Sequence, residues 1–329
     1  MTEEASSRYF PFDLFDPHWL GMNGGEMGAR IARLAPFSLH PPYPWGQWLY
    51  GQLLQERGAG LGGDIVECGV GRGGMSLFLG TFARQIGRKV YSLDSFAGLP
   101  APNPVFDNPY FRAGDYSADA ALGDLLERFR AAIIYEGLAE TIVAIPGFFE
   151  SSLHQLPAQR PFGFVHVDVD LYHSCYEVLD RLFPRIVDGG ILVIDDFFHQ
   201  SLGPARAARE YFSSIGYVPL YQVSFPYSVV IVKGQNPPPA QHRAIDGNHY
   251  SLRLLRKDQV LCKAIHLSLD RAEAAVVPRE AENARRLCGL LESGRDDASS
   301  DIYEYWRALA DFWDAIDAGR PDDRAPIMI

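Results

Sequence analysis

Between residues 64 and 234 the chain alternates short apolar runs with longer amphipathic stretches. The apolar runs predict buried strands, and the stretches between them, such as 119–135 and 172–183, have the spacing of helices. This alternation predicts right-handed βαβ units and therefore an α/β fold built on a parallel sheet. The expected strands are 64–69, 89–94, 141–147, 162–168 and 191–196.

The end of this region has a different pattern. A helix is expected at 203–215, followed by strands at 217–223 and 228–234 with Phe225-Pro226 between them. A hairpin that closes a parallel run is unlike an ordinary dinucleotide-binding domain. It resembles the Rossmann-like, seven-stranded sheet of class I S-adenosylmethionine methyltransferases, whose last strand is antiparallel.

Composition changes on either side of this core and predicts three parts. Residues 1–60 are rich in aromatic residues, proline and glycine, and we expect them to form a helical, aromatic lid. Residues 61–235 form the cofactor-binding core. After NPPPAQH, residues 236–329 are expected to be a helical extension, whose last helix has apolar residues at helical spacing. That apolar stripe either packs on the protein's own core or forms a dimer contact or substrate lid, so a homodimer through the C-terminal helices is an open expectation.

The charge and cysteine content narrow the class of protein. With 329 residues and a formal net charge of −11, an extended nucleic-acid surface is not expected. No stretch has the ~20 apolar residues of a membrane span, and MTEEASS lacks the order of a signal peptide. Four cysteines without CxxC spacing predict neither a zinc site nor a disulfide framework. We expect a reduced, cytoplasmic protein with a small-molecule partner.

A glycine-rich loop follows the first expected strand. Its GxGxxG spacing lets the backbone approach a nucleotide, and Asp94, at the end of the second strand, is placed to accept from ribose hydroxyls. The loop alone fits NAD as well as S-adenosylmethionine. Glu67, within the strand, favours a cationic methionine portion, unless it forms an ion pair with Arg72. The loop glycines are Gly69, Gly71 and Gly74.

Carboxylates also follow two later strands. Asp168 begins DVDLY, and Asp195 and Asp196 follow ILVI. Because the carboxyl ends of parallel strands face the ligand crevice, these side chains are expected to converge there. Three oxygen donors suit a hard divalent ion such as Mg²⁺. The alternative for the paired aspartates is a helix N-cap with a solvated neighbour.

Together these motifs resemble the macrocin O-methyltransferase (TylF-type) family. The resemblance covers roughly residues 60 to 215 and rests on DIVECGVGRGG, DSFAGLP, PGFFESSL, DVDLYHS and LFPRIVDGGILVIDDF, in family order. It implies S-adenosylmethionine as the methyl donor and Mg²⁺ as a required ion. By position it implies metal ligands at Asp168, Asp195 and Asp196. It implies cofactor contacts at Glu67, Asp94, Ser95, Phe96, Gly147 and Phe148, with an aromatic wall for adenine at Phe148 or Phe149.

The function expected from the sequence is O-methylation of a hydroxyl on a small molecule, such as a sugar of a natural product. A metal-bound acceptor oxygen would lose its proton more easily, and Asp168 is the preferred base. His199, close after the paired aspartates, is the other candidate, against an ordinary exposed loop histidine. A phenol, a catechol or a carboxylate (including one on a modified peptide) stays open as the acceptor, as does a non-catalytic assembly protein.

Overall fold

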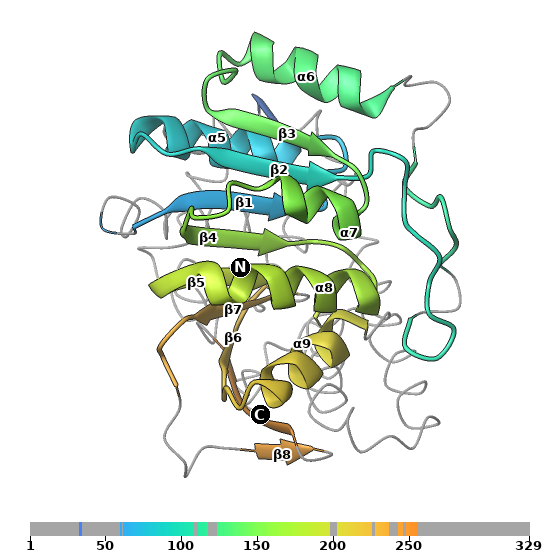
Figure 1. Cartoon of the computed structure of the whole chain (residues 1–329), viewed down its shortest axis with the longest axis vertical. Coiled ribbons are helices and arrows are strands. Elements are labelled where there is room, and N and C mark those ends of the chain that lie inside the picture. Colours follow the sequence, from blue (N-terminus) through green and yellow to red (C-terminus); the bar gives the residue numbers. More distant parts are fainter. Residues whose placement is uncertain are drawn as a thin grey trace, which may run out of the picture.

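The fold is a mixed sheet with helices on both faces (Figure 1). The computed structural model describes residues 33–34, 60, 62–107, 111–117, 124–197, 203–225, 228–236, 243–245 and 248–254. The strands are β1 (Asp64–Cys68), β2 (Val90–Asp94), β3 (Ile142–Pro146), β4 (Phe162–Val167), β5 (Ile186–Ile194), β6 (Leu220–Phe225), β7 (Ser228–Val232), β8 (Arg243–Ile245) and β9 (Asn248–Leu254). The helices are α5 (Gly74–Gln85), α6 (Leu125–Tyr135), α7 (Phe149–Ser152), α8 (Tyr172–Leu182) and α9 (Gly203–Ser214).

The sheet order is β3-β2-β1-β4-β5-β7-β6-β9-β8. Strands β1 to β5 pair in parallel, whereas β7 pairs antiparallel with both β5 and β6. The predicted parallel run with an antiparallel last strand of the hairpin is therefore confirmed.

The expected number of strands is wrong, because the sheet has nine strands rather than seven. Strand β9 pairs in parallel with β6, and β8 pairs with β9. Both lie in the stretch expected to be a helical extension, so that expectation is corrected for 243–245 and 248–254. The remainder of the extension and nearly all of the predicted lid at 1–60 lie outside the described residues.

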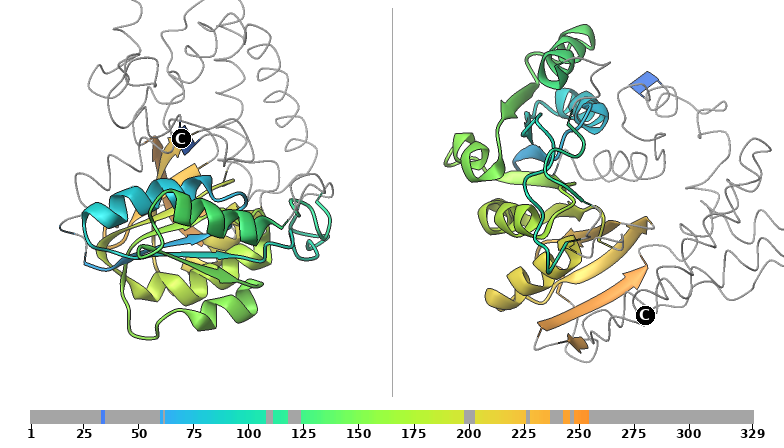
Figure 2. Two further views of the ribbon diagram at one scale, coloured as in Figure 1. Left: turned by 90° about the horizontal axis from the view of Figure 1, so that it is seen from above. Right: turned by 90° about the vertical axis from the view of Figure 1, so that its right-hand side faces the viewer.

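The helices form two layers around the sheet. Helices α7, α8 and α9 lie on one face and α5 on the other (Figure 2). Helix α6 has a local cap, because Asp124 accepts a hydrogen bond from Glu127 N at 3.1 Å. Covering both faces explains why every residue of β4 is buried, as in other parallel sheets.

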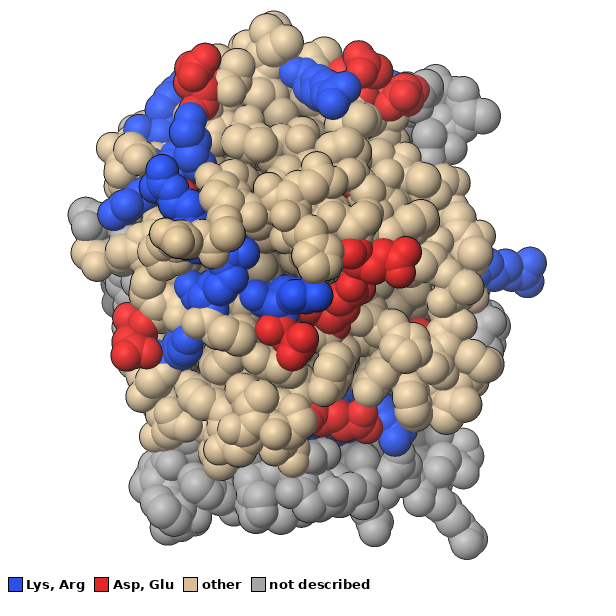
Figure 3. Space-filling model, in the orientation of Figure 1, with Lys and Arg blue, Asp and Glu red and all other residues tan. Residues whose placement is uncertain are grey.

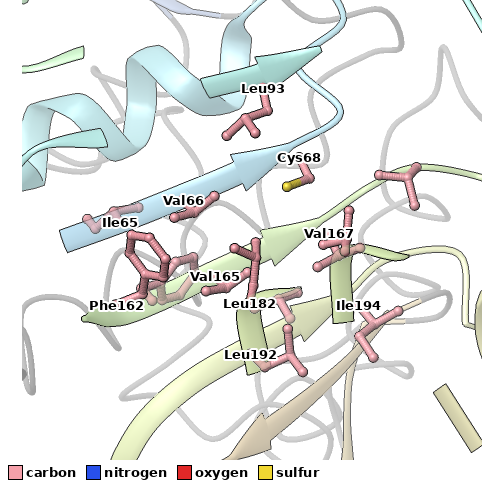
Figure 4. Close-up of a cluster of buried hydrophobic side chains, with 14 of the residues drawn as sticks. Ile65, Val66, Cys68, Leu93, Phe162, Val165, Val167, Leu182, Leu192 and Ile194 are labelled. Carbon is pink, nitrogen blue, oxygen red and sulfur yellow. The ribbon is translucent and has the colours of Figure 1, made fainter. Parts of the chain in front are cut away.

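The core lies between these layers. Figure 4 shows Val165 and Val167 of β4 packed between β1 and β5, with Leu182 of α8 over them. Cys68 and Cys175 are buried free thiols, as the sequence predicted. No helix among the described residues is long and apolar enough to cross a bilayer.

Charges on the face covered by α7, α8 and α9 are unevenly distributed. Lysine and arginine side chains gather at the amino-terminal side of the strands (Figure 3). The carboxylates singled out from the sequence follow β4 and β5 at the opposite, carboxyl-terminal side. The two ends of the sheet therefore differ in charge.

Candidate active site

The carboxyl ends of four neighbouring strands are joined by backbone hydrogen bonds. Gly69 N donates to Leu93 O at 2.9 Å, Asp168 N donates to Cys68 O at 2.8 Å, and Asp195 N donates to Val167 O at 2.8 Å. These bonds place the residues that follow β1, β2, β4 and β5 side by side. The glycine loop and the acidic motifs therefore share one edge of the sheet.

The glycine loop approaches its neighbours too closely for side chains. Gly69 has φ +87°, and a Cβ there would lie 1.6 Å from the carbonyl oxygen of Asp168. Gly73 has φ +96°, and a Cβ there would lie 2.3 Å from the Phe129 ring. Gly71 also has positive φ, whereas Gly74 is simply the buried first residue of α5. Sequence reasoning missed Gly73, although the doubled glycine of GRGG was a visible signal.

Asp94 shapes this loop from the end of β2. Its Oδ2 accepts from Val70 N at 2.7 Å and from Gly71 N at 3.0 Å. Its Oδ1 accepts from Phe96 N at 2.7 Å. The acid expected to contact the ribose is partly exposed and also holds the backbone that follows β1 and β2.

Glu67 lies beneath the loop and is only 1% exposed. The Ser76 hydroxyl donates to its Oε2, and Ser92 Oγ lies 2.7 Å from Ser76 Oγ. His166 Nδ1 is 3.8 Å from Glu67 Oε1. Burial raises the pKa of Glu67 to about 8, against the lowering effect of the Ser76 hydrogen bond. Ser76 and Ser92 carry no sequence motif and were not predicted.

The residues predicted beside the adenosine line the loops after β2 and β3. Ser95 Oγ donates to Gly98 O at 2.7 Å and closes a tight turn. The Phe96 ring stacks on Phe129 with centroids 5.9 Å apart. Gly147 N donates to Asp94 O at 2.8 Å, and the following Phe148 is 43% exposed. The exposed ring of Phe148 therefore follows β3, which pairs with β2, the strand that ends in Asp94.

The acidic motifs bring four carboxyl groups together. Burial and the neighbouring carboxylates raise the pKa of Asp168, Asp170 and Asp196 well above the usual range. The Asp170 and Asp196 side chains are hydrogen-bonded to each other, and both residues have left-handed backbone angles. Asp195 Oδ1 accepts from the Ser228 hydroxyl of β7. Asp170, two residues after Asp168, thus belongs to the same cluster.

The side chains of this cluster are of the type that binds a divalent cation, but their positions do not form a metal site. Its donors are carboxylate oxygens whose charges destabilise one another, and a hard cation would offset that repulsion. Within the described ranges, however, no three Asp, Glu, His or Cys side chains converge closely enough to hold a metal ion.

Two further residues, His199 and Tyr116, bear on the acidic cluster. His199 lies outside the described residues, so its role stays a prediction. Tyr116, which the sequence did not single out, has φ +62° and lies within electrostatic range of Asp170, Asp196 and Asp168. Burial and these carboxylates raise the pKa of the Tyr116 hydroxyl, so it stays protonated as a donor.

The chain is similar to known O-methyltransferases over part of its length. Over 145 residues the chain is 36% identical to the 8-demethyl-8-(2,3-dimethoxy-alpha-L-rhamnosyl)-tetracenomycin-C 4'-O-methyltransferase of Streptomyces olivaceus, covering 42% of this chain and 54% of that protein. It is 31% identical over 144 residues to the demethyldecarbamoylnovobiocin O-methyltransferase of Streptomyces niveus, covering 41% and 53%. The chain thus spans about half the length of the curated relatives it matches. Among solved structures, the O-methyltransferase NovP is 24% identical with a TM-score of 0.49, over 59% of this chain and 81% of NovP.

A profile of the macrocin O-methyltransferase (TylF) family matches residues 53–217. That range contains the glycine loop, Asp94 and both acidic motifs. The chain belongs to the macrocin O-methyltransferase (TylF) family.

Proposed function

We propose that the protein is an S-adenosylmethionine-dependent O-methyltransferase. One observation supports this most directly: Asp94, at the end of β2, holds the glycine loop at Val70 and Gly71. The acidic cluster follows β4 and β5 at the same edge of the sheet. With the cofactor at the glycine loop and the acceptor at the acidic cluster, the two reactants would lie next to each other, as an in-line methyl transfer requires.

The acceptor we propose is a hydroxyl on a sugar or similar polyol of a natural product. The relatives named above are O-methyltransferases of tetracenomycin- and novobiocin-type compounds. Mycinamicin III 3''-O-methyltransferase of Micromonospora griseorubida is a third relative, 29% identical over 145 residues. The Tyr116 hydroxyl and the carboxyl groups near it offer both donors and acceptors to a polyol.

Asp168, Asp195 and Asp196 are the residues we propose to hold Mg²⁺. When bound, the ion would lower the pKa of an acceptor hydroxyl and orient it. Asp168 is the proposed base, because the residue is partly exposed and its backbone N donates to Cys68 O at the edge where β1 and β4 meet.

The first experiment is isothermal titration of S-adenosylmethionine, S-adenosylhomocysteine and NAD, each with Mg²⁺ or with EDTA. We expect both sulfur nucleotides to bind and NAD to give no heat. The absence of binding heat with both sulfur nucleotides would overturn the proposed cofactor. Mass spectrometry of sugar-bearing natural products incubated with enzyme and cofactor then identifies the acceptor by the gain of one methylene.

The proposed metal is tested separately by thermal unfolding with and without Mg²⁺. We expect Mg²⁺ to raise the melting temperature of the wild type, because an ion that binds only the folded state stabilises it. Asp196→Asn should melt at a higher temperature than the wild type without the ion, and should lose the response to it. Asp115→Asn, a change outside the cluster, is the matched control. An equal Mg²⁺ response in the wild type and Asp196→Asn contradicts the assignment of Asp196 as a ligand.

A further inference from the structure

A buried carboxylate outside the described site joins two loops next to it. Asp107 lies in the connection between β2 and α6 and is 7% exposed. Its Oδ1 accepts from Tyr172 N at 2.7 Å, and its Oδ2 accepts from Asn103 N at 2.7 Å. Both oxygens are thus used to hold backbone, one in its own turn and one at the start of α8.

Helix α8 depends on this distant residue for its cap. Leu171 occupies the N-cap position and has no side chain that can accept a hydrogen bond. Asp107 supplies the acceptor from 65 residues earlier in the chain. A carboxylate at this place satisfies a backbone donor that would otherwise be unpaired, and it interacts favourably with the helix dipole.

Further contacts fix the turn 103–107 against α8. Asn103 Nδ2 lies 3.0 Å from His173 Nε2. The Phe106 ring packs against Tyr172 with centroids 4.5 Å apart, and the Arg206 guanidinium of α9 lies 4.3 Å from the Phe106 centroid. The turn therefore contacts both helices.

The start of α9 is built around the same carboxylate. A Cβ on Gly203 would lie 2.4 Å from Asp107 Oδ1 and 2.8 Å from Tyr172 N. The absence of a side chain at Gly203 is what lets α9 approach the junction. Asp107 is therefore in contact range of three segments that are far apart in the sequence.

Each of these segments continues into the candidate active site. The turn 103–107 comes after Asp94 in the same connection, and Asp94 holds the glycine loop. Helix α8 follows the Asp168–Leu171 turn directly, and α9 is the first described element after the paired aspartates. Asp107 thus connects the cofactor side of the site to its acidic side.

We propose that Asp107 is a positioning residue that couples the cofactor-binding loop to the Asp168–Leu171 turn. Cofactor bound at Asp94 orders the connection from β2, and Asp107 transmits that order to the start of α8. The inference rests on the proposed function, because it assumes that the glycine loop and Asp94 bind S-adenosylmethionine.

Hydrogen–deuterium exchange of the full chain, with and without S-adenosylhomocysteine, tests this coupling without knowledge of the acceptor. In the wild type we expect the nucleotide to slow exchange about tenfold in both 62–76 and 168–176. In Asp107→Ala the slowing should persist in 62–76 and fall below about twofold in 168–176. Asp107→Asn keeps one acceptor oxygen and should give an intermediate result. Asp115→Asn, in the same connection, is the control and should behave as the wild type.

Gly203→Ala provides a second route to the same result, because its methyl group would meet both the Asp107 carboxylate and Tyr172 N, the two ends of this hydrogen bond. It should lose the slowing in 168–176 as Asp107→Ala does, and it remains informative if Asp107→Ala does not fold. Wild-type slowing of 168–176 in a folded Asp107→Ala or Gly203→Ala variant would overturn the proposal. Titration calorimetry distinguishes a failure of the proposed cofactor from a failure of the proposed coupling. The absence of heat when S-adenosylhomocysteine is titrated into the wild type refutes the proposed cofactor. Binding that protects only 62–76 refutes the coupling.

Discussion

The buried acid Glu67 is expected to make stability depend on pH. Its pKa is about 8 in the folded protein against an ordinary value of 4.5, because burial disfavours the charged form. Between these values the folded state binds more protons than the unfolded state, so the free energy of unfolding falls as pH rises. Glu67→Gln removes this contribution. Urea denaturation from pH 5 to 8 should show a shallower decline for the variant, by up to about 1.4 kcal/mol per pH unit.

The control for this experiment is Asp115→Asn, which changes an acid of the β2–α6 connection away from Glu67. It should keep the wild-type dependence on pH. The difference between slopes therefore reports on Glu67 together with its influence on the neighbouring Asp168, whose pKa Glu67 helps to raise. Identical slopes for the wild type and Glu67→Gln would show that Glu67 is ionised in the folded protein at neutral pH.

Asp94 is expected to act on the cofactor through the loop that it holds. Asp94→Asn replaces one acceptor oxygen with an amide that cannot accept from Val70 N and Gly71 N or from Phe96 N. We expect the affinity for S-adenosylhomocysteine to fall at least about tenfold, which is about 1.4 kcal/mol. Calorimetric titration measures it, with Asp124→Asn, the α6 cap, as a control for loss of a carboxylate elsewhere. Unchanged affinity in Asp94→Asn contradicts this role.

The acids of the site were predictable from the sequence because they stand directly after apolar runs. Asp94, Asp168 and the Asp195–Asp196 pair each follow a strand whose end could be read from the pattern. Asp107 and Ser76 could not be found in this way. Asp107 meets Tyr172 only when segments 65 residues apart pack together, and Ser76 meets Glu67 only when α5 folds back onto β1.

At the scale of elements, the start of α5 is expected to tolerate no side chain at Gly73. Alanine there incurs about 1–2 kcal/mol for its left-handed backbone. It also incurs about 1–3 kcal/mol for overpacking against Phe129 of α6. Gly87→Ala is the matched control, because Gly87 also has positive φ but faces open space. Urea denaturation should therefore show a larger loss of stability for Gly73→Ala than for Gly87→Ala. Equal losses would mean that the contact with Phe129 adds nothing.

Element boundaries were predictable where hydrophobicity changes sharply and not elsewhere. The buried runs of β1 and β4 were located to within a residue or two. Strand β5 begins at Ile186, earlier than the expected 191. Exposed Asp188 and positive-φ Gly189 interrupt its apolar pattern there. Strand β9, with the sequence NHYSLRL, is too polar to stand out as a strand.

At the scale of the whole molecule, the sheet does not end with the predicted hairpin. β6 would be an edge strand in a seven-stranded sheet, but here β9 pairs along Leu220–Val223. An unpaired edge offers backbone donors and acceptors to other chains. The extension after Gly234 therefore has one structural role that does not depend on the predicted homodimer, which is to cover the edge of β6.

Two truncated chains test this role. A chain that ends at Asn236 loses β8 and β9 and exposes the edge of β6, whereas a chain that ends at Leu254 keeps every described strand. We expect the shorter chain to melt at a lower temperature and to self-associate more in sedimentation velocity, because its free edge can pair with another chain. Equal melting temperatures and equal sedimentation would show that β9 adds nothing to the core. If the full chain is a dimer and both truncated chains are monomers, the contact lies in residues 255–329, which is one of the two roles left open for the apolar C-terminal stripe.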